Sequence, residues 1–230
     1  MTVINIDIVS DFVCVWCYIS KRNLEAAMAL YNKTYPNART DDSFALTYRP
    51  YFLNHAGGHI SFGSSLPKSQ VAERKLGHLS QDQRDALQAR MERNGRGVGI
   101  MFRWGGNIGP TQDAHRLAYV SRRKGGGVQS VLVEGLLAAY HEQERDIAKR
   151  ETLREIALAA GMTGDEVDEA FSSEEVARYV DEEQEKYRRV AEGKGVPLYI
   201  IQGEHRIDGA QDASEFFDVF IKVKEADTVV

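Results

Sequence analysis

The sequence predicts an α/β fold in which a β-α-β / β-β-α sheet domain carries a large all-helical domain inserted in its middle. Apolar and polar residues alternate near both ends of the chain, which is typical of strands, whereas apolar residues recur at helical spacing from about residue 66 to residue 192. The strand signals from both ends are therefore expected to form one sheet. We place its first part at residues 1–60, the helical insertion at 61–190 and its second part at 191–230.

The first part of the sheet begins with a strand, because Ile4, Ile6 and Ile8 alternate with polar residues. A helix with apolar residues three and four positions apart follows, and Pro36 is predicted to end it. Alternation at residues 44–48 indicates a second strand. This order predicts a β-α-β unit at the beginning of the chain.

The middle of the chain carries helix signals. Three capping boxes are predicted, each a Ser or Thr followed three residues later by Glu or Gln: Ser80 with Gln83, Thr163 with Glu166, and Ser172 with Glu175. Asn94-Gly95 is predicted to end the first of these helices, and the Gly-rich stretch 98–110 is predicted to be a loop. Thr111 is predicted to cap the helix that follows.

The end of the chain returns to strand periodicity. Residues 198–201 and 205–207 flank Gln202-Gly203, which is a hairpin signal. An amphipathic pattern at residues 213–220 then predicts a last helix. These elements complete the β-β-α half of the predicted sheet domain.

Composition limits the classes of partner. The 230 residues are 43% hydrophobic and 27% charged, with a formal net charge of −5, which is ordinary for a globular protein with a sizeable core. Acidic and basic residues are mixed without a long basic stripe, so no nucleic-acid partner is expected. No apolar run approaches the roughly 18 residues of a membrane span and no secretory signal is visible, so we expect no membrane partner and a cytoplasmic location.

Both cysteines of the chain lie in one four-residue window, as Cys14 and Cys17. A disulfide closing so short a loop hardly constrains the unfolded chain, so this pair indicates redox chemistry or metal binding rather than a structural staple. A structural zinc site needs four protein ligands, and there is no second cysteine pair. His55 and His59 lie too far along the chain for the usual Cys/His spacing, so no metal is expected.

The position of the pair, where a strand gives way to a helix, favours redox chemistry. Only the thiolate attacks a disulfide, and the partial positive charge of a helix N-terminus should stabilise the thiolate of Cys14. Cys17, one turn further along, can attack a mixed disulfide on Cys14 and release the substrate. The redox-active disulfide then needs no other cofactor. Trp16 is either an apolar platform for substrates or part of the core.

Four stretches, in order along the chain, resemble motifs of the DsbA-like thioredoxin-fold proteins of the FrnE type: SDFVCVWCYISKR at 10–22, DAHRL at 113–117, GVPLY at 195–199 and IDGAQ at 207–211. The resemblance spans nearly the whole chain. It implies a thioredoxin fold with a helical domain inserted in the middle. The family pattern has proline where Val15 stands in this sequence, so the direction of electron flow stays open.

The resemblance also implies a wider site. Although most X-Pro bonds are trans, it implies a cis Val196–Pro197 bond that faces the cysteines and offers backbone hydrogen bonds to a substrate. It places His115 in the insertion that covers the site, where this residue would line the pocket and transfer protons. A His at a helix start is otherwise more often structural. Asp7, an acid inside a predicted strand, is a weaker candidate for proton transfer to Cys17.

Three functions are compatible with these features. The first is a thiol-disulfide oxidoreductase that acts on a disulfide-containing protein or a small-molecule thiol, as a monomer or a homodimer. The second is a glutathione-dependent transferase or isomerase of the kappa or 2-hydroxychromene-2-carboxylate isomerase type, with glutathione as co-substrate. Those relatives use a serine near the first cysteine position, so Cys14 and Cys17 favour dithiol chemistry. The third is a non-catalytic binding module.

Overall fold

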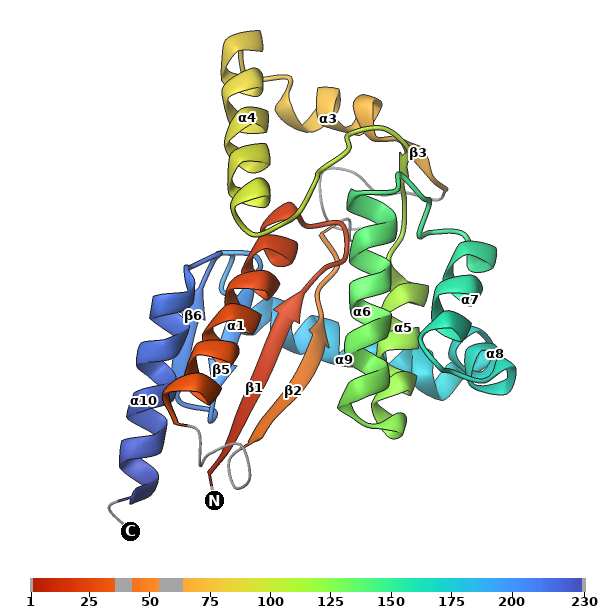
Figure 1. Ribbon diagram of the computed structural model, residues 1–230. Helices are drawn as coiled ribbons and strands as arrows, with labels where there is room; N and C mark the ends of the chain where they lie inside the picture. The colour runs from red at the N-terminus through yellow and green to blue at the C-terminus, as the bar shows by residue number, and fades with distance from the viewer. Residues whose placement is uncertain (1, 36–42, 54–63, 229–230) are drawn as a thin grey trace.

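A computed structural model (Figure 1) describes residues 2–35, 43–53 and 64–228. The strands are β1 Val3–Ser10, β2 Ser43–Pro50, β3 Leu66–Pro67, β4 Asn107–Ile108, β5 Leu198–Ile201 and β6 His205–Asp208. The helices are α1 Val15–Thr34, α3 Lys68–Leu76, α4 Gln81–Gly97, α5 Gln112–Ser121, the 3₁₀ turn η1 Arg122–Lys124, α6 Gly126–His141, α7 Arg150–Ala159, α8 Gly164–Ser172, α9 Glu174–Val190 and α10 Ala213–Thr228.

One mixed sheet joins the two ends of the chain in the order β2-β1-β5-β6. β1 runs parallel to β2, with Ile6 opposite Leu46, and antiparallel to β5, with Ile8 opposite Tyr199. β5 and β6 form the predicted hairpin, whose turn residues Gln202 and Gly203 both have positive φ, at 54° and 75°. The predicted fold class, an α/β thioredoxin fold with a helical insertion, is confirmed.

Both faces of strand β1 carry buried residues, and each face packs against helices on its own side of the sheet. Ile4, Ile6 and Ile8, each at most 2% exposed, belong to the main core with residues of α1 and α10, which lie together in front of the sheet (Figure 1). Val9 points to the other side and packs with Tyr187 of α9. Because successive side chains of a strand point to opposite faces, β1 packs against helices on both sides of the sheet. The two cysteines follow directly after the end of this strand.

The helices between β2 and β5 form two groups. α5 packs against α6, α7, α8 and α9, whereas α4 stands over the N-terminal end of α1 and α3 lies crosswise to α4 (Figure 1). The loop after α4 is tied back to that helix, because the Trp104 indole donates to Glu92 across 2.9 Å. α4 thus lies beside the end of α1 that carries the cysteines.

Two of the three predicted capping boxes are confirmed, at Ser80 and at Thr163. The third is wrong by one residue, because Ser173 caps α9 and accepts from the Val176 amide. The hydroxyl of Ser172 is already engaged in the last turn of α8, where it donates to the Asp168 carbonyl across 2.6 Å. A side chain that bonds its own helix is unavailable as a cap for the next.

The structure differs from the sequence prediction at two further places in the insertion. α4 continues through Gly95 to Gly97, and a Cβ on Gly95 would come within 2.4 Å of the Phe102 ring. This glycine permits close packing rather than ending the helix. The insertion also contains the short antiparallel pair β3–β4, so it is not entirely helical, and the predicted loop 98–110 holds one of its strands. Two-residue strands are too short to leave a periodic signal.

None of the helices in the described ranges is long and apolar enough to cross a membrane.

Candidate active site

Cys14 is the N-cap residue of α1, at the end of a short turn that follows β1. Its backbone is extended, with φ −90° and ψ 114°, and its amide donates to the Asp11 carbonyl across 3.1 Å. The Cys14 carbonyl in turn accepts from the amides of Cys17 and Tyr18 at 3.1 and 3.3 Å. The first thiol therefore lies where the unpaired N–H groups and the partial positive charge of α1 favour a negative sulfur.

Both cysteines are free thiols with little exposure, 7% for Cys14 and 4% for Cys17. Burial raises the pKa of Cys17 well above its usual value, and the neighbouring Cys14 raises it further. A hydrogen bond with the Asp11 backbone opposes this shift of the Cys17 pKa. Cys17 is therefore a protonated thiol near neutral pH, and any reaction that uses its thiolate must first remove a proton.

The opposite wall of the site comes from the other end of the chain. The Val196–Pro197 bond is cis, the isomer that the family resemblance implied, and the Cys14 thiol donates to the Val196 carbonyl oxygen across 3.8 Å. This approach follows from the pairing of β1 with β5, which sets Val9 opposite Leu198. The antiparallel pairing of β1 with β5 in the mixed sheet thus brings together the predicted residues Cys14, Val196 and Pro197.

The predicted site residue His115 lies behind the turn that carries the cysteines. Its Nε2 is 3.4 Å from Asp11 Oδ1, and both side chains are almost completely shielded from solvent. The ring lies between Phe12 and Phe52, with centroids 4.5 and 5.3 Å away. Asp11 Oδ2 accepts from the Leu53 amide at 2.9 Å. Among the described residues, Asp11 Oδ1 and His115 Nε2 are buried and make no well-aligned hydrogen bond. Each is therefore the nearest polar partner that the structure offers the other, at 3.4 Å.

The DSBA-like thioredoxin domain family matches residues 5–220. The chain belongs to this family. Its membership supports an enzyme with disulfide oxidoreductase activity and confirms the resemblance to DsbA-like proteins. No curated protein sequence matches the chain.

Solved structures share this fold over nearly the whole chain. A probable DsbA oxidoreductase from Streptomyces coelicolor is 23% identical, with a TM-score of 0.80, over 96% of this chain and 90% of that one. The cytosolic disulfide reductase DsbM from Pseudomonas aeruginosa, solved with GSH, is 14% identical, with a TM-score of 0.58, over 96% and 99%. A 2-hydroxychromene-2-carboxylate isomerase is 13% identical, with a TM-score of 0.58, over 97% and 98%.

Trp16, between the two cysteines of this DSBA-like site, is half-buried and packs against the main core. The Arg90 guanidinium of α4 lies over its ring, 5.2 Å from the centroid. The packing agrees with the interpretation of Trp16 as part of the core, and its role as a platform for substrates stays a prediction.

The Asp7 carboxylate, a candidate for proton transfer to Cys17, is hydrogen-bonded to other residues. Its carboxylate accepts from Arg49 at 2.8 Å and from the Tyr187 hydroxyl at 3.2 Å, on the α9 side of the sheet. The acid whose charge acts on the Cys17 thiol is Asp11 instead. Sequence reasoning missed this residue, although it stands inside the quoted motif three positions before Cys14. An acid in an otherwise apolar turn was the available signal.

The residue after Cys17 anchors α1 to α6. The Tyr18 hydroxyl lies 2.9 Å from a Glu134 oxygen and 2.8 Å from a Glu142 oxygen, and burial raises the pKa of Tyr18. Lys21 also reaches Glu134 across 2.7 Å. These contacts fix the orientation of the cysteine-bearing turn against the insertion. No local pattern predicts them, because the partners are more than 100 positions apart.

A cavity of about 410 Å³ lies between α3 and α4, and its lining includes Lys68, Arg84 and Trp104. Burial lowers the pKa of Lys68 to about 8, and its ammonium donates to the Tyr140 carbonyl at 2.6 Å. Within the described residues no cluster of three or more His, Cys, Asp or Glu side chains could hold a metal ion. His55 and His59 lie outside those residues.

Proposed function

We propose that the protein is a thiol-disulfide oxidoreductase in which Cys14 is the nucleophile and Cys17 the resolving thiol. The observation that carries this proposal is the position of the Cys14 sulfur, at the N-terminus of α1 and against the Val196 carbonyl, with Cys17 buried one turn behind it. A nucleophilic thiolate needs such an electropositive setting, and a resolving thiol needs proximity and shelter from other disulfides.

The reaction follows from the order of the two sulfurs. The Cys14 thiolate attacks one sulfur of the substrate disulfide, a Cys14–substrate S–S bond forms, and the other substrate sulfur leaves as a thiolate. Cys17 then loses its proton and attacks the Cys14 sulfur. The mixed disulfide breaks, the second substrate thiolate leaves, and a Cys14–Cys17 disulfide remains. The substrate is reduced and the protein oxidised, and the reverse sequence would donate a disulfide.

The Asp11–His115 pair is the proposed acceptor for the Cys17 proton. The buried Asp11 charge already acts on Cys17, and the His115 ring gives the pair a second site for a proton. Once the pair holds the added proton, its 3.4 Å contact can tighten into a charge-assisted hydrogen bond. His115 thus serves proton transfer from behind the cysteines, and Trp16, Val196 and Pro197 face the substrate.

A second candidate is the glutathione-dependent chemistry of the isomerase and kappa-class type. A structural neighbour, the cytosolic disulfide reductase DsbM, was solved with GSH, which supports glutathione as a co-substrate of the dithiol pair and a cytoplasmic site of action. A glutathione transferase or isomerase would need only one activating residue at position 14. The resolving thiol of Cys17 would then have no purpose, so the dithiol function is preferred.

Disulfide reduction by the wild type and two single variants separates these functions. With insulin or 2-hydroxyethyl disulfide as substrate and excess glutathione as reductant, Cys14→Ser should lose all activity. Cys17→Ser should lose activity toward insulin, and when glutathione is left out it should accumulate a mixed disulfide on Cys14. Glutathione transferase activity that survives in Cys17→Ser, without any disulfide reduction by the wild type, would favour the second candidate. Equal disulfide reduction by all three proteins would exclude both roles of the cysteines.

A further inference from the structure

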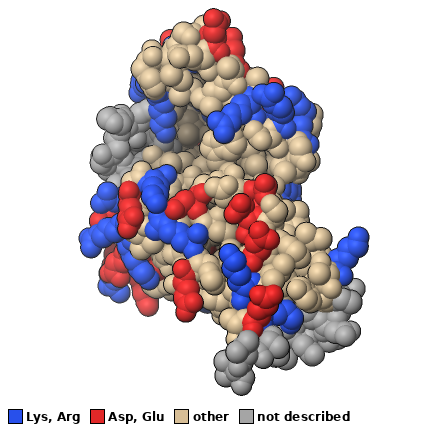
Figure 2. Space-filling model, turned by 90° about the vertical axis from the view of Figure 1, so that its left-hand side faces the viewer, with Lys and Arg blue, Asp and Glu red and all other residues tan. Residues whose placement is uncertain are grey.

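The segment that contains α3, α4 and the loop after α4 is a basic part of an acidic protein. Residues 66–106 hold eight Lys and Arg but only four Asp and Glu, a net charge of +4 in a chain whose total is −5. The rest of the chain therefore carries −9. Figure 2 shows Lys and Arg side chains on both sides of a hollow in the upper part of one face, whereas acidic and basic side chains are mixed below it.

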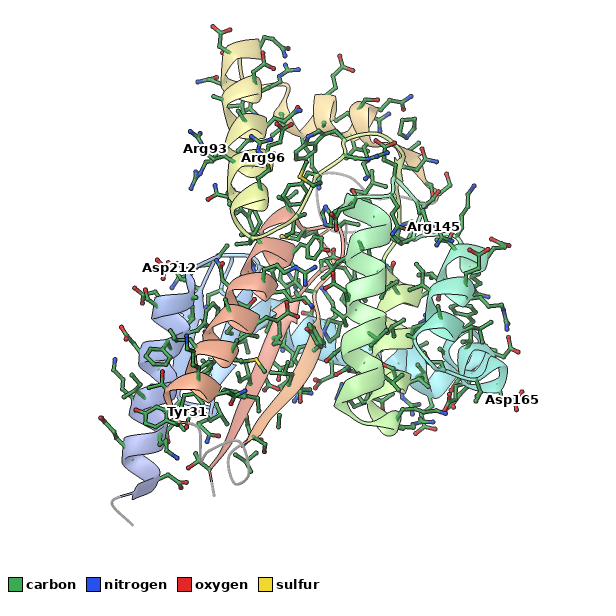
Figure 3. All side chains as sticks on the ribbon, in the orientation of Figure 1. Tyr31, Arg93, Arg96, Arg145, Asp165 and Asp212 are labelled. Carbon is green, nitrogen blue, oxygen red and sulfur yellow. The ribbon has the colours of Figure 1, made fainter. Side chains whose placement is uncertain are left out.

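Arg90, Arg93 and Arg96 form a stripe along one broad face of α4. All three are exposed, and their spacing of three residues covers about 9 Å of helix length at roughly 1.5 Å per residue. Figure 3 shows Arg93 projecting outward from the helix. We call these three residues the α4 arginine stripe.

The charge of this stripe is largely unneutralised by the protein itself. Of the three arginines in the stripe, only Arg96 has an acidic partner among the described residues, Glu92 at 3.6 Å. That carboxylate also accepts a hydrogen bond from the Trp104 indole. Exposed cations in other parts of the insertion have acids beside them, as in the pairs of Arg123 with Glu169, Arg154 with Asp168 and Arg178 with Glu182. Arginines without internal partners remain available for an external anion.

The stripe begins at the reactive site. The Arg90 guanidinium lies over the ring of Trp16, between the two cysteines, and α4 packs against α1. Carboxylates held on α4 would therefore lie beside Trp16, in the turn that carries the two cysteines, rather than on a remote face.

We propose that the α4 arginine stripe docks an acidic polypeptide segment, whose carboxylates pair with Arg90, Arg93 and Arg96 while a neighbouring disulfide reaches Cys14. The inference rests on the proposed oxidoreductase function and names its substrate class. A polypeptide fits better than a small molecule, because the stripe is an open helix face and none of its members lines the cavity between α3 and α4. Exposed charge of this kind raises the rate of encounter with a complementary partner.

The test uses three synthetic peptides that differ only beside a single cysteine, which is activated as a 2-pyridyl disulfide. The flanking residues are Asp and Glu, Ser, or Lys. Cys14 of the reduced protein attacks the peptide sulfur, a Cys14–peptide S–S bond forms, the S–S bond to the pyridyl group breaks, and pyridine-2-thiolate leaves. Cys17 then displaces the peptide thiol and the protein ends as its disulfide. The absorbance of the released pyridinethione gives the second-order rate constant.

At low ionic strength the wild type should react with the acidic peptide about ten times faster than with the Lys peptide, and salt should remove most of that difference. The triple variant Arg90→Gln, Arg93→Gln, Arg96→Gln should lower the preference, expressed as the ratio of the rate constants with the acidic and the Lys peptide, to about two-fold. The Ser peptide reports any change in rate that is common to all three peptides. The matched control carries Arg123→Gln, Arg154→Gln and Arg178→Gln, with the same change in net charge elsewhere on the insertion, and should keep the full preference.

Two results would overturn the proposal: a wild type that reacts with all three peptides at one rate, or a preference that the stripe variant and the control retain equally. A result in which no peptide reacts with Cys14 at all would instead contradict the oxidoreductase function on which the proposal rests.

Discussion

The Cys14 thiol donates a hydrogen bond to the backbone carbonyl oxygen of Val196, 182 positions further along the chain, across 3.8 Å. The contact exists because β1 ends at the cysteine turn and its antiparallel neighbour β5 begins one residue after Pro197. A substrate sulfur bound to Cys14 would take the place of the thiol proton beside this carbonyl. The site is thus assembled from both ends of the sheet, and the insertion between them supplies its surroundings.

Removal of the Asp11 carboxylate should slow the resolving step selectively. In Asp11→Asn we expect the first attack by Cys14 to stay within about two-fold of wild type, whereas resolution by Cys17 slows about 100-fold, the usual scale for loss of a general base. The mixed disulfide should accumulate in acid-quenched samples. Raising the pH should restore the rate, because the solvent then deprotonates Cys17, whose pKa is raised by burial.

Asp7→Asn is the matched control for this experiment, since Asp7 is bonded to Arg49 and Tyr187 on the other side of β1. Its resolving rate should equal that of the wild type. His115→Gln should behave like Asp11→Asn, with the same recovery at high pH. A resolving rate that is slow at every pH would indicate a merely structural role for the pair.

His141 should make the protein sensitive to acid. This histidine is buried beside Tyr18, Phe102 and Tyr140, and burial lowers its pKa to about 3 in the folded state, against an ordinary value of 6.5. Below pH 6.5 the unfolded chain binds a proton that the folded protein cannot accept. The free energy of unfolding should therefore fall as the pH drops from 6.5 toward 3, by up to about 1.4 kcal/mol for each pH unit.

Urea unfolding at pH 7 and pH 5 measures this contribution. Between these two values the wild type should lose about 2 kcal/mol more than His141→Gln, which has no group to titrate in this range. The control His78→Gln removes an exposed histidine and should keep the wild-type loss. Equal losses in the wild type and His141→Gln would show that another group governs the acid response.

Val15 occupies the first helical position of α1, where the family pattern has proline. Its amide has no backbone acceptor among the described residues, so Val15→Pro sacrifices no hydrogen bond and places a residue suited to that position. We expect the free energy of unfolding to change by less than about 1 kcal/mol. Ala26→Pro, at an exposed position inside the same helix, should cost about 3 kcal/mol or more in the same chemical denaturation.

A large loss of stability in Val15→Pro would mean that the turn before α1 differs from the one described. If the variant folds normally, its reduction potential can be compared with that of the wild type. That comparison isolates what the residue between the cysteines does to the redox couple.

The elements that sequence patterns predicted correctly have local causes. Alternation at Ile4, Ile6 and Ile8 reflects burial of one face of one strand, and the capping boxes at Ser80 and Thr163 span four residues each. Such signals are complete within a short window. The same locality explains the error at Ser172, since two adjacent serines offer the same cap and only the bond of Ser172 to its own helix decides between them.

The features that escaped sequence analysis are contacts between distant segments. Asp11 and His115 meet only after β1 and α5 are folded against each other, and nothing near either residue indicates its partner. The arginines of α4 are spaced too widely along the chain to form a basic run. Their importance becomes visible when Arg90 is found over Trp16. The extents of the three segments 1–60, 61–190 and 191–230 stay predictions.

The roles of the two cysteines are tested by the intact mass of Cys17→Ser after incubation with a disulfide peptide, followed by peptide mapping. We expect a stable adduct of one peptide, attached through a disulfide to Cys14 and released by dithiothreitol, whereas the wild type should show no adduct and an intramolecular Cys14–Cys17 disulfide. A variant that remains unmodified while the wild type reduces the same peptide would contradict the assignment of Cys14 as nucleophile and Cys17 as resolving thiol.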